Sequence, residues 1–119
     1  MKFALPLSLC ILLFSFNAHA NDKKAGLQAG ANLYRSAGCE HCHGEGGIGA
    51  KKGPPLIGRT FQKQWSDEKI KNQLNLGGKK MPAFSDDLSD DDIAKLIVYL
   101  RAKHRPAPTV PVPAEKNRD

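Results

Sequence analysis

Two cysteines and a histidine stand at a spacing that suits covalent attachment of a haem. Residues 39–43 read Cys-Glu-His-Cys-His and are followed by Gly44. Two thiols three residues apart on one helical turn can add to the two vinyl groups on one edge of a haem. The adjacent imidazole would then lie under the ring, where it can bind the iron. The motif predicts one haem c, held by Cys39 and Cys42, with His43 as an axial ligand.

Other uses of these thiols account for less of the sequence. A structural zinc site usually takes four protein ligands, whereas residues 21–119 offer two cysteines and three histidines, of which His41 lies inside the motif. A thioredoxin-like dithiol needs a βαβ context, and no strand pattern surrounds the motif. A plain disulfide between Cys39 and Cys42 would leave His43 and Gly44 unexplained.

Residues 1–20 have the pattern of a cleaved secretory signal peptide. Lys2 precedes a 14-residue apolar stretch, Phe3 to Phe16, and residues 18–20 form an Ala-x-Ala cleavage site. The stretch is shorter than the roughly 17–25 residues of a spanning helix, so a retained anchor is the less favoured alternative. Cys10 follows Leu9, where a lipoprotein signal would need a small residue. We expect a mature chain that begins near Asn21 in the periplasm.

Three helices are expected to position the motif in an all-α domain of residues 21–105. The first has an apolar face at i, i+3, i+4 and i+7, made of Leu27, Gly30, Ala31 and Tyr34. The second runs from about Ser66 to Leu76 and ends at two glycines, residues 77–78.

The third helix follows Ser89, with Asp92 at the N3 position of a capping box. Its apolar stripe consists of Ile93, Leu96, Ile97 and Leu100. Residues 44–64 show no period, and a loop of that length suggests a function such as wrapping a haem. Residues 106–119 are rich in proline and predict a flexible tail.

A second axial ligand is expected on the other side of the iron. Met81 is the one methionine beyond the leader, and it stands between a glycine turn and Pro82. That position suits a sulfur held at a fixed height better than core packing. His104 is the alternative ligand, although a cation at the end of the last helix is explained more simply by the helix dipole.

Taken together, these residues resemble the class I cytochromes c, in particular the small single-haem bacterial ones. The resemblance covers most of residues 26–104 in the family order. The matching residues are Gly30, Tyr34, Cys39, Cys42, His43, Gly44, the run Gly53-Pro54-Pro55-Leu56, Met81-Pro82, Leu96 and Tyr99.

The resemblance implies several roles for individual residues. Gly30 should let the first helix cross close to the last, with Tyr34 packing near Leu96 and Tyr99. The carbonyl of Pro54 should accept a hydrogen bond from Nδ1 of His43. Arg59 and Trp65 resemble residues that bind a haem propionate, while core packing is the alternative role of Trp65.

Basic residues are expected to surround the exposed haem edge. Residues 21–119 hold 17 Lys and Arg against 12 Asp and Glu, a formal net charge of +5. Lys51 and Lys52 follow the attachment motif, while Lys79 and Lys80 precede Met81. They could steer the protein to acidic redox partners, or serve solubility alone.

The sequence therefore indicates a monomeric, extracytoplasmic mono-haem cytochrome c that carries single electrons between redox proteins. It would be no enzyme, would not bind nucleic acid, and would have no membrane span after cleavage. One alternative is a haem-based gas-binding or sensing module with a labile sixth ligand. Another is a cytochrome subunit fixed to a dehydrogenase, with the proline-rich tail as a tether.

Overall fold

The computed structural model describes residues 17–113, and this part of the chain is helical and contains no strand, which confirms the all-α prediction. The helices are α1 (Asn17–Ser36), α2 (Cys39–His43), the 3₁₀ helix η2 (Glu45–Gly47), α3 (Gly58–Gln64), α4 (Asp67–Leu76) and α5 (Asp90–Arg101). Residues 1–16 of the predicted signal peptide lie outside the described residues. None of the described helices combines the length and apolar character needed to cross a membrane.

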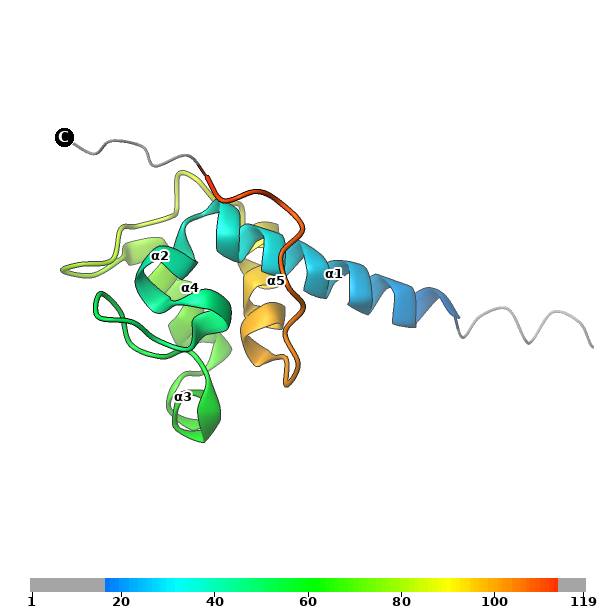
Figure 1. The fold of residues 1–119 in the computed structure, drawn as a ribbon, viewed down its shortest axis with the longest axis horizontal. Helices are drawn as coiled ribbons and strands as arrows, with labels where there is room; N and C mark the ends of the chain where they lie inside the picture. Colours follow the sequence, from blue (N-terminus) through cyan, green and yellow to red (C-terminus); the bar gives the residue numbers. More distant parts are fainter. Residues whose placement is uncertain (1–16, 114–119) are drawn as a thin grey trace, which may run out of the picture.

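Helices α1 and α5 cross closely at the centre of the core (Figure 1). Gly30 of α1 is buried against α5, so that a Cβ at this position would lie 2.3 Å from the Lys95 carbonyl oxygen. One turn further along α1, the Tyr34 ring lies 5.2 Å from the Tyr99 ring between centroids. Tyr34, Leu96 and Tyr99 are all fully buried, as the family resemblance implied.

Helices α4 and α5 begin at the predicted caps. Ser66 Oγ accepts a hydrogen bond from the Lys69 amide at 3.2 Å. Ser89 and Asp92 form the reciprocal capping box, with 3.1 Å for each of the two bonds. Helix α4 ends at Leu76, where Gly77 adopts φ 68°, and α5 ends at Arg101, ahead of the first proline of the tail.

The stretch 44–64, which we expected to be irregular, contains η2 and α3. Helix α3 has only seven residues, and its N-cap, Ile57, offers no side-chain hydrogen bond. Phe61 is the one buried residue of α3, so the helix lacks the repeated apolar positions that a sequence pattern needs. The preceding loop is tied to itself by the Gly49 amide, which donates to the His43 carbonyl at 2.6 Å, and by the Leu56 amide, which donates to the Gly47 carbonyl at 2.7 Å.

Residues 106–113, here called the C-terminal strap, make contacts with α1 that we did not expect from the sequence. The strap runs along α1 (Figure 1) and is held by side chains spaced i, i+4 and i+7 on that helix. The bonds are Gln28 Nε2 to the Ala107 carbonyl (3.0 Å), the Thr109 amide to Asn32 Oδ1 (2.8 Å), Asn32 Nδ2 to Thr109 Oγ1 (3.1 Å) and Arg35 Nη1 to the Val110 carbonyl (3.3 Å). Proline content predicted the absence of a helix, but not the contacts with α1. Residues 114–119 lie outside the described part.

Candidate functional site

A large open cavity of about 1870 Å³ lies between α2, the loop after it, α4 and α5. It exceeds the roughly 300–1,000 Å³ of ordinary small-molecule sites. Apolar side chains from α3, α4, α5 and the loops before α3 and after α4 line it, including Leu56, Phe61, Ile70, Leu74, Phe84, Leu96 and Leu100. The cavity therefore suits a large, mostly apolar group.

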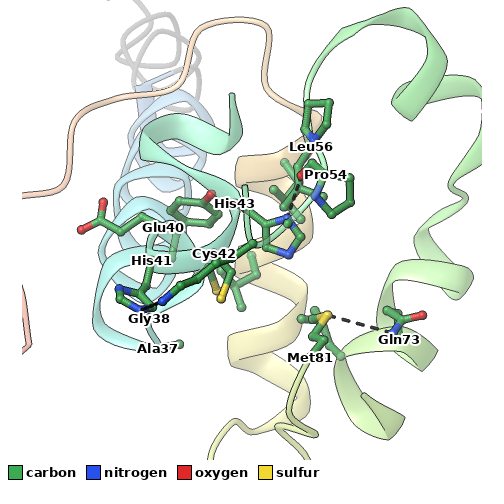
Figure 2. A pocket seen from close by; sticks show the side chains of 18 of the residues that line it. Ala37, Gly38, Glu40, His41, Cys42, His43, Pro54, Leu56, Gln73 and Met81 are labelled. Atoms are coloured by element: carbon green, nitrogen blue, oxygen red, sulfur yellow. Dashed lines mark hydrogen bonds between the residues drawn. The ribbon is translucent and has the colours of Figure 1, made fainter. Parts of the chain in front are cut away.

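Helix α2 brings Cys39, Cys42 and His43 to the lining of the cavity, and Figure 2 shows Cys42 and His43 there. His43 ends this helix, and its Nδ1 lies 2.8 Å from the Pro54 carbonyl oxygen. Because a carbonyl can only accept, Nδ1 carries the proton and donates it. This tautomer leaves the lone pair of Nε2 free to bind a metal.

Gly53 allows the close approach of the Pro54 loop to α2. A Cβ at Gly53 would lie 2.9 Å from the Cys42 carbonyl oxygen and 3.0 Å from Nδ1 of His43. A larger residue would therefore push the loop away from His43. The glycine and proline of this run thus act together on the imidazole.

Cys39 and Cys42 are both free thiols that line the cavity, and they do not form the alternative disulfide. Cys39 packs against the core. Burial, as the main cause, raises the pKa of its thiol to about 12, so that the group is protonated at neutral pH. Within residues 17–113, no group of three or more Cys, His, Asp and Glu side chains is placed to hold a metal ion.

Met81 reaches the same cavity from the loop that follows α4 (Figure 2). The loop is folded back on itself, because the Gly78 amide donates to the Met81 carbonyl at 2.8 Å. Nε2 of Gln73 lies 3.0 Å from the Gly77 carbonyl oxygen and 4.0 Å from the Met81 sulfur. A Cβ at Gly77 would lie 2.7 Å from the Met81 carbonyl oxygen, so the tight turn requires glycine.

The donor set and the lining of the cavity fit a haem. Thiols, an imidazole and a thioether are the kinds of group that attach and ligate haem c in general. In this chain such groups come from two segments, α2 and the loop after α4. Both segments line the same cavity as the apolar side chains.

Comparison with known families identifies the family of the chain. Residues 25–100 match the model of the family described as cytochrome C oxidase, cbb3-type, subunit III. The chain belongs to this family of class I c-type cytochromes. Neither a curated protein nor a solved structure was found to match the chain. Family membership implies haem c as the cofactor and electron transfer as the general role.

The rim of the cavity in this cytochrome carries three of the four lysines singled out in the sequence. Lys52, Lys79 and Lys80 line it, whereas Lys51 does not. All four lysines are exposed. Lys52 Nζ lies 3.0 Å from Nε2 of the exposed His41, which places a further basic group on the same rim.

The cytochrome brings one of the two expected propionate residues to the cavity. Trp65 lines it and stacks on Phe61, with 6.5 Å between the ring centroids. Arg59 is exposed and does not line it. His104, the alternative axial ligand, is also exposed and outside the lining.

Two features of the site were not expected from the sequence. Gln73 approaches the Met81 sulfur, and the spacing of eight residues between them gives no local signal. Val112 and Pro113 of the C-terminal strap are part of the cavity lining. Arg35 connects the strap with α2, because it donates to the Val110 carbonyl and pairs with Glu40 of α2 at 2.9 Å.

Proposed function

We propose that this cytochrome is a periplasmic electron carrier with one haem c bound covalently through Cys39 and Cys42. His43 and Met81 would be the two axial ligands of the iron. The observation that carries the proposal is the His43–Pro54 hydrogen bond of 2.8 Å, which leaves Nε2 of an oriented imidazole free toward a cavity that Met81 also lines. Haem supplies reversible one-electron chemistry at its iron.

The roles of the chain's own residues follow from their chemistry. Each cysteine would lose its S–H proton to the vinyl group as the carbon–sulfur bond forms, so attachment needs no oxidant. Pro54 keeps the His43 ring in one orientation and one tautomer. Gln73 and the turn at Gly77 restrain the Met81 sulfur, which favours the same ligand in both oxidation states and little reorganisation.

The basic rim supplies a docking surface for acidic redox partners. Lys52, Lys79 and Lys80 line the cavity mouth, so a partner that neutralises them would be steered to the haem edge. Trp65 is the candidate for contact with a propionate, through its indole N–H. We further propose that residues 1–20 form a cleaved signal peptide, that the mature chain is a monomer, and that it catalyses no substrate chemistry of its own.

Mass spectrometry of the denatured protein tests the covalent attachment. The chain is produced with the haem-attachment machinery, and the expected result is a mature chain from Asn21 plus one haem that survives denaturation. The C39S/C42S double variant should lose the haem on denaturation. A wild-type chain with no retained haem, or a double variant that still retains it, would contradict the proposal.

A further inference from the structure

Arg105 is a half-buried cation that the proposed electron transfer does not yet use. It lies between α5 and the C-terminal strap, and no carboxylate in the described part of the chain lies within ion-pair distance of it. Burial lowers the pKa of its guanidinium, yet an arginine remains charged. A partly buried charge without a carboxylate partner costs free energy, so other polar groups are expected to stabilise it.

The guanidinium is satisfied by backbone carbonyls instead of an acid. Its Nη1 donates to the Gly46 carbonyl, while its Nη2 donates to the Leu56 carbonyl at 2.6 Å and the Leu100 carbonyl at 2.7 Å. Its Cζ lies 5.3 Å from the centre of the Tyr99 ring, within the range of a cation–π contact. The planar fork of arginine allows this set of bonds, whereas the single ammonium of a lysine does not reproduce it.

The three carbonyls belong to the two ends of one loop and to the last helix. Gly46 and Leu56 flank the segment that contains Pro54, and Leu100 belongs to α5. Arg105 therefore closes the loop that presents the Pro54 carbonyl to His43. The fit is tight at this point, because a Cβ at Gly47 would lie 2.6 Å from Nη1 of Arg105.

We propose that Arg105 is a positioning residue for the His43 side of the haem, and that its charge favours the ferrous state. The inference rests on the proposed haem site. The clamp keeps the Pro54 carbonyl against Nδ1 of His43. A fixed positive charge behind this loop destabilises the ferric iron more than the ferrous iron, because the ferric centre carries one more positive charge. The reduction potential is therefore raised by the arginine.

The test compares the midpoint potentials of the haem-loaded wild type, R105Q, R105K and K103Q at one pH and ionic strength. Lys103 is an exposed cation two residues away, so K103Q removes the same charge from a solvated position. For R105Q we expect the ferrous-to-ferric ratio at a fixed ambient potential to fall about tenfold, which is 59 mV for one electron. The ratio should fall less in R105K than in R105Q. In K103Q the ratio should stay within about twofold of the wild type, since solvent screens an exposed charge.

Amide hydrogen exchange supplies a readout for the clamp itself. In R105K the Leu56 and Gly47 amides should exchange faster than in the wild type, because lysine cannot hold both ends of the loop. If R105Q does not fold, the midpoint potential and the amide exchange rates of R105K test the inference instead. Unchanged exchange in R105K, an R105Q ratio within twofold of the wild type, or an equal shift in K103Q would overturn the inference. A wild-type protein without haem would instead overturn the proposed function.

Discussion

The backbone of Gly30 in α1 touches the carbonyl of Lys95 in α5 so closely that a Cβ would lie 2.3 Å from the oxygen. The same Cβ would lie 2.7 Å from Cβ of Tyr99. Backbone atoms cannot swing aside as the end of a flexible side chain can. The helix crossing that supports the attachment motif therefore depends on the absence of a side chain at residue 30.

The variant G30A should lower the free energy of unfolding by about 1–3 kcal/mol, the usual cost of overpacking a well-packed contact. Urea unfolding of the haem-loaded protein measures it. G26A is the matched control in the same helix, because a Cβ there meets nothing within 4 Å. It should be neutral or stabilising by up to about 1 kcal/mol, through helix propensity. Equal losses in G30A and G26A would refute the tight crossing.

Stability should fall at alkaline pH because of Tyr34 and Tyr99. Burial is the main cause that raises the pKa of both phenols above the ordinary value of about 10. The folded state then holds these protons more tightly than the unfolded state. The stabilisation that results is fully present below about pH 10, the ordinary pKa of the unfolded phenols. It is lost as pH rises through the higher folded pKa, and the free energy of unfolding then falls by up to about 1.4 kcal/mol per pH unit for each tyrosine.

Urea unfolding between pH 7 and pH 11 measures this slope, and Y34F should reduce it. Y34F also removes the 2.7 Å hydrogen bond from the hydroxyl to the Gly44 carbonyl. It should therefore cost about 0.5–1.5 kcal/mol at pH 7, the usual net contribution of one hydrogen bond, because the Gly44 carbonyl keeps its bond from the Gly47 amide at 3.0 Å. A slope above pH 10 that is the same in Y34F and the wild type would exclude Tyr34 as its source.

Charge removal at the cavity rim should slow electron transfer to an acidic partner. In the triple variant K52Q/K79Q/K80Q we expect the second-order rate constant at low salt to fall by about tenfold or more. Stopped-flow kinetics against an acidic redox protein, over a range of salt concentrations, should also show a weaker salt dependence. K63Q, on the exposed side of α3, should leave the rate unchanged, because Lys63 does not line the cavity. Unaltered rates in the triple variant would leave solubility as the role of these lysines.

Deletion of residues 106–119 should destabilise the protein by about 1–3 kcal/mol. Several hydrogen bonds join the C-terminal strap to α1, and each contributes about 0.5–1.5 kcal/mol before solvent competes for the exposed ones. Thermal or urea unfolding measures the loss. Deletion of residues 114–119 alone keeps every one of these bonds and should have little effect. Full stability after the longer deletion would mean that the strap does not support the fold.

The sequence predicted those parts of the molecule that are specified locally. Ser66, Ser89 and Asp92 cap α4 and α5 as expected, because a cap depends on residues within one turn. The attachment motif likewise lies within five residues. Gly30 and Pro54 were placed through the family resemblance, and their contacts follow it.

The missed features depend on contacts between distant residues. The C-terminal strap meets side chains 75–79 positions away, so its composition alone suggested a flexible tail. Arg105 reaches carbonyls 49 and 59 positions away. Every residue has a backbone carbonyl, so the sequence does not indicate which ones an arginine will bind. Helix α3 lacks both a cap and a repeated apolar face, and Arg59 at its start does not reach the cavity.

Met81 is the residue whose removal should change the ligand chemistry most. In M81A the haem should stay attached through Cys39 and Cys42, while the sixth position of the iron becomes open. Reduced M81A should then bind CO rapidly. Q73A should weaken the hold on the sulfur and allow slow CO binding, because the amide near the sulfur is lost.

The most direct test is the visible absorption spectrum of the purified, haem-loaded wild-type protein, oxidised and reduced, with and without CO. The account predicts a low-spin spectrum with the weak far-red band of a Met–ferric bond and no change on adding CO to the reduced form. A missing far-red band, or rapid CO binding by the wild type, would contradict Met81 as the sixth ligand and favour a gas-binding module.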